Sequence, residues 1–372
     1  MIRLLHLADV HLGRAFAALG TQGASQRRAL AQALERAVDL ALADQVHLVL
    51  VAGDLFDSPR PAPATVDEVV RQFRRLIERG IGVAVAGGNH DVGADGRIGA
   101  ADRLGALGPR VMVFGREVQT HVLPELDVTV VGRSADPGRS DSPLRGWPRQ
   151  RTTRVAVGVT HGSVFRPGQV ETPGVIHPLE IRELGLDYLA LGDWHSAQEV
   201  VGPPTAAWYS GAPELLAVDQ EGPGCVLRVD IAAPGQAAVR PVPVGRRRYR
   251  RVVIDLSDAD DAAVRARLDA AADADTVCDV VLTGLVPVHR VVDPAAWERE
   301  YADRFFRLRV RWRAQIQLAD EELDALPADS VLGRFVRVMR DRLAAADDAQ
   351  RPILEEALQV GVALLQGREV LA

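Results

Sequence analysis

Five short hydrophobic runs in this chain each lead directly into polar residues, and this repeated pattern constrains the fold more than any other feature. The runs cover residues 2–8, 47–52, 81–86, 154–160 and 186–191. A short apolar run that stops at a glycine or a polar residue is typical of a buried strand that ends at a loop. In open α/β sheets, ligand-binding groups gather just beyond the carboxyl ends of the strands. The pattern therefore predicts that side chains from five loops meet in one small volume.

The residues that follow these runs have the chemistry of a metal site. Carboxylate and amide oxygens bind hard divalent cations, and imidazole suits manganese, iron and zinc. A pair of such cations can clamp a phosphodiester and activate a water. The predicted metal ligands are Asp9, His11, Asp54, Asn89, His161, Asp193 and His195.

A histidine beside one of these ligands is the candidate proton donor. His90 follows Asn89, and either Asp57 or Asp91 could orient its imidazole. We predict that His90 acts as the general acid for the leaving oxygen. Each short motif occurs by chance in many chains, and only the ordered set is specific.

Composition limits the other functions that this chain could have. Its 372 residues carry a formal net charge of -6 and include no lysine, so any contact with nucleic acid must come from a local arginine patch. The two cysteines, Cys225 and Cys278, do not make a disulfide framework and indicate a reducing compartment. Asp9 and His11 interrupt the first apolar run, which argues against a signal peptide, and no run approaches the ~20 residues of a membrane span. We expect a soluble, cytoplasmic protein.

The order of the expected elements divides the chain into three parts. Residues 1–244 alternate strands and helices, which predicts an α/β domain that carries the site. Within it, a helix is expected over 26–44, and a capping box at Thr65 and Glu68 is expected to open the next helix. Residues 245–318 begin with an arginine-rich run and predict a small α/β capping domain, and residues 319–372 predict terminal helices.

The ordered motifs resemble those of a known superfamily. They are Asp9-x-His11, Gly53-Asp54-x-x-Asp57, Gly88-Asn89-His90-Asp91, His161-Gly162 and Gly192-Asp193-x-His195, and this set resembles the calcineurin-like metallophosphoesterases. Within that superfamily the chain is most similar to the DNA-repair exonuclease branch, which includes the nuclease subunit of SbcCD and the YhaO-type proteins. The segment Ser210–Glu214 also resembles a segment of that branch. The resemblance covers residues 1–216 and implies a four-layer α-β-β-α sandwich; beyond residue 245 only the layout is similar.

The resemblance also implies a role for each motif residue. The first metal would be held by Asp9, His11, Asp54 and His195, and the second by Asp54, Asn89, His161 and the residue at position 193. His90 would be the catalytic histidine. Nucleases of this branch usually work with Mn²⁺, so we expect two Mn²⁺ ions, with Mg²⁺, Fe²⁺ and Zn²⁺ as alternatives.

One position departs from the family pattern. The last motif is usually Gly-His-x-His, whereas here Asp193 takes the place of the first histidine. A carboxylate can still ligate, and it would favour manganese or magnesium. Alternatively, Asp193 points away and weakens the second site. We interpret Trp194 as a structural plug, with base stacking as the alternative.

Two features beyond residue 300 suggest partners. Four arginines alternate with apolar residues and so share one face of a strand; they are Arg307, Arg309, Arg311 and Arg313. This face could bind the DNA backbone, or it could be an ordinary solvated face. The helical spacing of apolar residues over 331–365 suits packing on the protein's own domain, or docking of an SMC-like coiled-coil ATPase, as the resemblance implies. A homodimer stays open.

We predict a manganese-dependent DNA nuclease that acts in DNA repair, an exonuclease for which endonuclease activity stays open. One alternative is a phosphodiesterase for small substrates, although such a substrate needs no arginine-lined annex. The other is a catalytically weakened subunit of a repair complex that has lost its second metal through Asp193.

Overall fold

The computed structural model describes residues 1–93, 98–168, 170, 172–217, 220, 223–257, 259–287, 293–317, 326–327 and 329–365. The chain forms two compact units, Met1–Arg248 and Tyr249–Ala372. The boundary lies within strand β12 (Ala237–Asp255), which contributes residues to both units.

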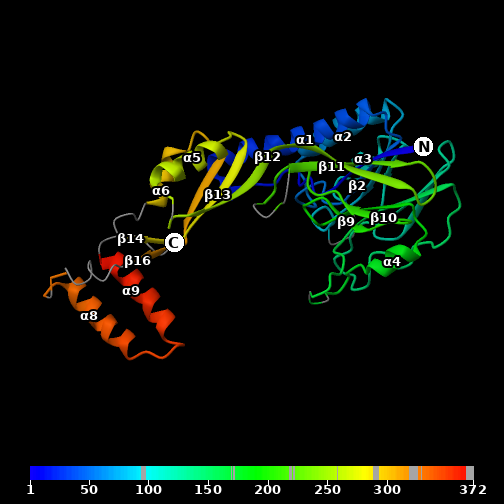
Figure 1. Ribbon diagram of the computed structural model, residues 1–372. Coiled ribbons are helices and arrows are strands. Elements are labelled where there is room, and N and C mark those ends of the chain that lie inside the picture. Colours follow the sequence, from blue (N-terminus) through cyan, green and yellow to red (C-terminus); the bar gives the residue numbers. More distant parts are fainter. Residues whose placement is uncertain are drawn as a thin grey trace. The chain divides into compact units, whose positions relative to one another are not determined.

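The first unit contains two sheets (Figure 1). Within this unit, the first sheet has the order β12-β11-β1-β2-β3-β4. Besides β12, its strands are β1 (Ile2–Leu7), β2 (Leu48–Ala52), β3 (Gly82–Ala86), β4 (Val111–Val113) and β11 (Pro223–Ile231). The second sheet has the order β5-β6-β7-β8-β10-β9. Its strands are β5 (Gln119–Leu123), β6 (Val128–Gly132), β7 (Val155–His161), β8 (Tyr188–Gly192), β9 (Gln198–Val201) and β10 (Ala206–Tyr209).

Helices lie on both sides of the sheet pair. They are η1 (Ala17–Gln22), α1 (Gly23–Ala43), α2 (Pro63–Ile77), α3 (Ala101–Gly105) and α4 (Pro178–Glu183). In Figure 1, α1 and α2 lie on one side of the sheets and α4 lies on the other. The predicted four-layer α-β-β-α arrangement is therefore confirmed.

Successive residues of each strand pack into different layers of the sandwich. Leu5 and Val49 face the helices and join the core formed with α1 and α2. Leu4 and Leu50 face the other way and pack against Val157 of the second sheet. The outer face of the second sheet packs against α4 and the loops around it. Because successive residues of a strand point to opposite faces, a strand buried on both faces must be apolar throughout, as these runs are.

The pairing of the strands brings the five predicted loops to one edge of each sheet. β1, β2 and β3 are parallel to one another, and β7 is parallel to β8. Parallel strands have their carboxyl ends at the same edge, so the loops after β1, β2 and β3 are neighbours, as are those after β7 and β8.

The start of α2 differs from the prediction. The helix begins at Pro63 and has no side-chain cap at Ala62, so the predicted capping box at Thr65 does not open it. Proline suits the first helical position, because its fixed φ is helical and its missing N–H has no partner there anyway.

The second unit contains an α/β part and a pair of helices. Within the described residues, its elements besides β12 are α5 (Asp261–Ala271), β13 (Thr276–Thr283), β14 (Leu285–Pro287), α6 (Pro294–Glu300), β15 (Arg307–Trp312), β16 (Gln315–Gln317), α8 (Val331–Ala344) and α9 (Arg351–Leu365). Leu308 and Val310 of β15 share a core with Val264 of α5 and Trp297 of α6. The helices α8 and α9 pack on each other through Val336, Met339, Leu358 and Val362.

The segment Ser210–Glu214 has a structural role at its last residue. Glu214 is fully buried, and its carboxylate accepts N–H groups from Leu215, Arg246 and Arg247 at 2.7–2.9 Å. We expect Glu214→Ala to lower the free energy of unfolding by about 3 kcal/mol, because two buried backbone donors and one part-buried donor lose their acceptor. Chemical denaturation measures this loss. Glu199→Ala, at an exposed position of β9, is the control, and equal midpoints for the two variants would contradict the assignment.

Among the residues that the structure describes, no helix has both the length and the apolar character needed to cross a membrane.

Candidate metal centre

Every residue predicted to form the site lies at or just beyond the carboxyl end of one of the five strands. Asp9 and His11 follow β1, Asp54 and Asp57 follow β2, Asn89, His90 and Asp91 follow β3, His161 ends β7, and Asp193 and His195 follow β8. Backbone hydrogen bonds join the first two loops, since the N–H groups of Asp9 and His11 donate to the carbonyls of Gly53 and Asp54 at 3.0 and 2.9 Å.

The backbone is strained at four of these positions. Asp9, His11, Asp54 and Asp193 have φ angles of 54, 50, 50 and 108°, a region that side-chain-bearing residues rarely adopt. Each such residue costs about 1–3 kcal/mol, and such strain clusters at functional sites. Here all four strained residues are predicted metal ligands.

Asp54 lies at the centre of the cluster. Its Oδ2 is 3.5 Å from His11 Nε2 and 3.7 Å from His161 Nε2. Its Oδ1 accepts the backbone N–H of His90 at 2.9 Å. One carboxylate thus faces residues from three other strand ends.

On one side of Asp54, a carboxylate fixes the orientation of His11. Asp57 Oδ1 lies 3.0 Å from His11 Nδ1, which leaves Nε2 facing Asp54. The rings of His195 and His90 stand edge-on to the His11 ring, with centroids 5.6 and 4.7 Å away. A carboxylate that holds the far nitrogen of a histidine is the usual support of a metal-binding imidazole.

On the other side, His161 joins the remaining predicted ligands. Its Nε2 is 2.9 Å from Asn89 Oδ1 and 3.9 Å from Asp193 Oδ1. The backbone N–H of Asp193 donates to Asp9 Oδ1 at 3.1 Å. Asp193 therefore points toward the cluster and not away from it.

Ser163, which the sequence reasoning missed, positions this unusual aspartate. Its hydroxyl donates to Asp193 Oδ2 at 2.5 Å, so the two carboxylate oxygens face Ser163 and His161. Its position two residues after His161, in a loop already assigned to the site, could have identified Ser163 as a candidate site residue.

Asp57, and not Asp91, is the carboxylate near His90. His90 Nδ1 lies 3.4 Å from the backbone carbonyl of Asp57 and 3.9 Å from its Oδ1. Asp91 instead accepts backbone N–H groups of Gly88, Leu55 and Phe56 at 2.7–3.1 Å, which ties the loops after β2 and β3 together. Asp91 therefore does not orient His90 as predicted, because both of its carboxylate oxygens already accept these backbone N–H groups.

Two glycines allow the loops to approach this closely. At Gly88 a Cβ atom would stand 2.1 Å from Asp54 Oδ1, and at Gly53, where φ is +93°, it would stand 2.2 Å from His161 Nδ1. Any side chain at either position would displace a residue of the cluster.

Burial sets the protonation of the cluster in the metal-free protein. Burial raises the pKa of Asp9 to about 7, against the opposing effect of His161. Burial also lowers the pKa of His11 to about 2, with His90 and His195 acting in the same direction. Burial lowers the pKa of His161 too, but the carboxylates of Asp54, Asp9 and Asp193 together raise it above its ordinary value. A buried group of like charges is stable only when protons or cations compensate it.

The donor set fits divalent cations. In the part of the chain that the structure describes, three groups of carboxylate and imidazole atoms converge within 4.8 Å: Asp9, His11 and His195; His11, Asp57 and His90; and Asp9, Asp54 and His161. His11 Nε2 is buried and, among the described residues, has no hydrogen-bond partner. A buried, neutral, unpartnered imidazole nitrogen that faces carboxylates is the arrangement that a cation would complete.

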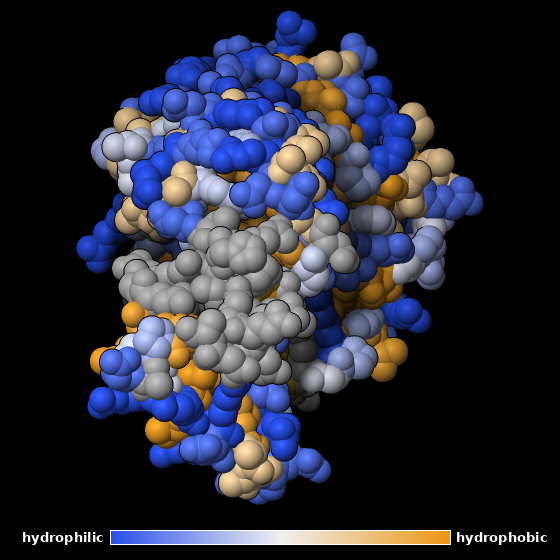
Figure 2. All heavy atoms as spheres, turned by 60° about the vertical axis from the view of Figure 1, so that its left-hand side comes forward, coloured by the Kyte–Doolittle hydropathy of each residue, from blue (hydrophilic) through white to orange (hydrophobic). Residues whose placement is uncertain are grey.

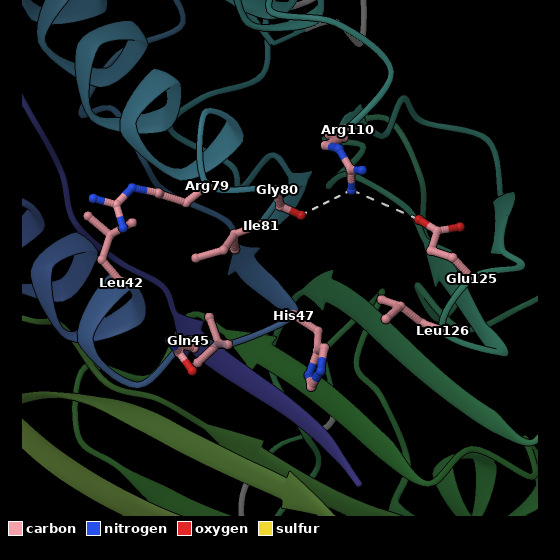
Figure 3. Close-up of a pocket in the computed structure, with 10 residues that line it drawn as sticks. Leu42, Gln45, His47, Arg79, Gly80, Ile81, Arg110, Glu125 and Leu126 are labelled. Atoms are coloured by element: carbon pink, nitrogen blue, oxygen red, sulfur yellow. Dashed lines mark hydrogen bonds and ion pairs between the residues drawn. The ribbon is translucent and has the colours of Figure 1, made fainter.

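A cavity of about 270 Å³ lies against this cluster. Asn89, His161 and Asp193 line one part of it, and Arg133 and Arg139 line another. A second cavity of about 430 Å³ is lined by residues that precede β2, β3 and β4, at the opposite end of these strands (Figure 3). There Arg110 lies between the carbonyl of Gly80 at 3.0 Å and the carboxylate of Glu125 at 3.9 Å. None of the predicted site residues lines this second cavity.

Comparison with known sequences places the chain in a family. The model of the calcineurin-like phosphoesterase family matches residues 2–197. The chain belongs to this family. The matched residues include all ten residues predicted for the metal and catalytic roles, and thus every strand end of the candidate centre.

Relatives of the chain include DNA-repair proteins. It is 28% identical over 274 residues to the DNA double-strand break repair protein Mre11 of Aeropyrum pernix, covering 69% of this chain and 64% of that protein. It is 25% identical to the SbcD component of the nuclease SbcCD of Bacillus subtilis, over 64% of this chain and 68% of that component. It is 23% identical to the uncharacterized metallophosphoesterase YhaO of the same organism, over 59% of this chain and 55% of that protein. The chain therefore spans about half to two thirds of the length of these relatives, and the resemblance to the DNA-repair branch is confirmed.

Proposed function

We propose that this protein is a two-metal DNA nuclease that hydrolyses phosphodiester bonds in DNA repair. One observation carries the proposal: five strand ends bring three carboxylates, an amide and three imidazoles into one cluster beside an open cavity. The similarity to Mre11 and to the SbcD component of the nuclease SbcCD supports DNA as the substrate.

The residues of the cluster form two proposed cation sites. We infer that Asp9, His11, Asp54 and His195 hold one cation and that Asp54, Asn89, His161 and Asp193 hold the other. The bound cations would offset the charge of the phosphodiester and make a water more acidic. The preference for Mn²⁺ is part of the proposal, and the carboxylate of Asp193 supports it over zinc.

His90 would protonate the leaving oxygen. Its side chain is 43% exposed and so can meet a substrate, while its backbone is fixed by Asp54. Asp57, whose oxygens lie next to Nδ1, would accept the Nδ1–H and stabilise the doubly protonated ring, whose Nε2–H is then free to protonate the leaving oxygen.

The arginine face of β15 is a proposed contact for the DNA backbone. Leu308 and Val310 are buried, whereas Arg309 and Arg313 are exposed, as the predicted alternation requires. Arg311 is less suited to this role, because it makes hydrogen bonds of 2.9 and 2.5 Å to the buried carboxylate of Asp279. We accordingly propose that Met1–Arg248 carries catalysis and that the α/β part of the second unit binds DNA.

The helix pair α8 and α9 is the proposed docking site for an SMC-like coiled-coil ATPase. Apolar side chains remain exposed on these two helices at Val331, Val338, Ile353, Leu364 and Leu365. Figure 2, which colours each residue by its hydropathy, shows apolar residues among charged ones on the face that it draws. Exposed apolar side chains that gather on one element are typical of an interface. A cytoplasmic location also stays a prediction, and the two free, buried cysteines are compatible with it.

A nuclease assay on end-labelled single- and double-stranded DNA with Mn²⁺, Mg²⁺, Co²⁺ or Zn²⁺ tests the proposal. We expect cleavage with Mn²⁺ and none with EDTA. Cyclic AMP and bis-p-nitrophenyl phosphate serve as small substrates. Faster turnover of cyclic AMP than of DNA would favour the small-substrate alternative, and cleavage of neither would favour the weakened-subunit alternative.

Proton release on metal binding follows from the buried cluster. Since the pKa of Asp9 is raised to about 7, Asp9 holds a proton below that pH and must lose it to bind a cation. We expect the apparent affinity for Mn²⁺ to rise by up to about tenfold per pH unit between pH 5 and pH 7, the effect of one released proton, and to level off above. Isothermal titration calorimetry in two buffers of different ionisation enthalpy measures the protons released. An affinity that does not change between pH 5 and pH 7 would contradict this.

A further inference from the structure

Trp194 is exposed, contrary to its interpretation as a structural plug. The residue stands between Asp193 and His195, yet 43% of its surface is accessible to solvent. Trp147 and Trp297, by contrast, are buried. Among the described residues, the other strongly exposed large hydrophobic side chains are all aliphatic. An indole left in solvent beside a catalytic cluster is available to a ligand.

A positively charged group is stacked on this indole. The guanidinium carbon of Arg166 lies 4.1 Å from the centre of the Trp194 ring. The same guanidinium donates a hydrogen bond of 2.6 Å to Gln198 Oε1, which fixes its orientation. The guanidinium therefore lies over one face of the indole, and this stack combines an aromatic ring with a charge.

Both residues are held by the loops that build the metal centre. Arg166 follows Ser163, the residue bonded to Asp193, by three positions. The backbone of this loop is anchored by Phe165 N–H to Ile176 O at 2.8 Å and by Ile176 N–H to Ser163 O at 2.9 Å. The backbone of Trp194 is flanked by Asp193, whose N–H binds Asp9. The stacked pair of Arg166 and Trp194 is therefore held in place by contacts within the protein.

We propose that Trp194 and Arg166 form a stacking site for one nucleobase next to the scissile phosphodiester. The inference rests on the proposed nuclease function and names what that site recognises. Base–aromatic stacking tolerates every base, because each base has a π face, and a stacked arginine adds to it. A base inside a duplex is already stacked, so the site takes bases of single strands and frayed ends. It gives the enzyme a preference for nucleotides over phosphodiesters that carry no base.

The kinetic test compares two substrates with the same leaving group. Thymidine 5′-(p-nitrophenyl) phosphate carries a base, and methyl p-nitrophenyl phosphate does not. We expect Trp194→Ala to lower the ratio of kcat/KM for the first substrate over the second by about 5- to 150-fold, the range that stacking of one base provides. Trp194→Phe should restore most of the ratio, and Arg166→Gln should lower it less than Trp194→Ala does. Leu179→Ala, which removes an exposed apolar side chain on α4, is the control.

A purely structural role of Trp194 gives a different result. Disturbance of Asp193 or His195 would lower kcat/KM for both substrates equally, and an unchanged ratio in Trp194→Ala overturns the proposal. A binding measurement in EDTA separates this outcome from failure of the nuclease function. There, Trp194→Ala should weaken the binding of oligothymidylate more than that of an abasic oligomer of the same length. If the wild-type protein hydrolyses neither of these substrates nor DNA, the nuclease proposal fails, and the binding comparison alone decides the stacking site.

Discussion

Asp54→Asn is expected to lower the rate of Mn²⁺-dependent phosphodiester hydrolysis by about 10³-fold or more. The reason is the position of this carboxylate, whose oxygens face His11, His161 and the backbone of His90. The amide keeps the shape but removes the charge and one ligand oxygen, and the stabilisation of transition-state charge by metals amounts to several kcal/mol. Initial rates on DNA, together with metal counts on the purified variant, measure the loss.

A loss of activity in this variant should not come from misfolding. Asp54 raises the pKa of buried Asp9, after the larger effect of burial itself, so its neutralisation relieves repulsion in the metal-free protein. We therefore expect the metal-free variant to melt at or above the wild-type temperature. Asp39→Asn, at a half-exposed side chain of α1, is the matched control and should keep full activity. A rate of hydrolysis by Asp54→Asn close to that of the wild type would contradict the two-metal proposal.

His90→Ala is expected to lower kcat on DNA by about 10²- to 10⁴-fold, the usual contribution of a general acid. Bound metal should stay at the wild-type level, because His90 has no place in either proposed ligand set. The side chain lies at the open edge of the cluster, with its ring centroid 4.7 Å from that of His11. Rates and metal content measured on the same preparation separate proton donation from metal binding.

The leaving group gives a second test of His90. A p-nitrophenolate leaves without a proton, whereas a DNA alkoxide needs one, so the loss should be much smaller on bis-p-nitrophenyl phosphate than on DNA. Equal losses on the two substrates would contradict a role in proton donation. His121→Ala, which removes a half-buried histidine of β5, is the control and should affect neither rate strongly.

The meeting of the five loops could be predicted because it depends on local patterns. Each run is apolar on both faces, and each ends in a glycine or a ligand-type residue, which marks a buried parallel strand and its carboxyl end. The structure places those ends together, with Asp54 at the centre. What the sequence could not show was which runs share a sheet, since β1, β2 and β3 belong to one and β7 and β8 to the other.

Contacts between side chains from different loops could not be predicted from the sequence. The bond between Ser163 and Asp193 and the three N–H donors around Asp91 depend on how loops pack, which no local pattern encodes. The exposure of Trp194 is of the same kind, because an apolar residue between two polar ones can face either the core or the solvent. The alternation of arginines in β15 could be predicted from the sequence. The pairing of Arg311 with Asp279 could not, because it depends on the register between β15 and β13.

The most direct measurement is a crystal of the protein soaked in Mn²⁺, with diffraction recorded at the manganese absorption edge. Two anomalous peaks should lie among Asp9, Asp54, Asn89 and His161, with a carboxylate oxygen of Asp54 between them. Asp193 should contact the peak next to His161. A map with no peak inside this cluster, at a concentration of Mn²⁺ that supports hydrolysis, would contradict the account.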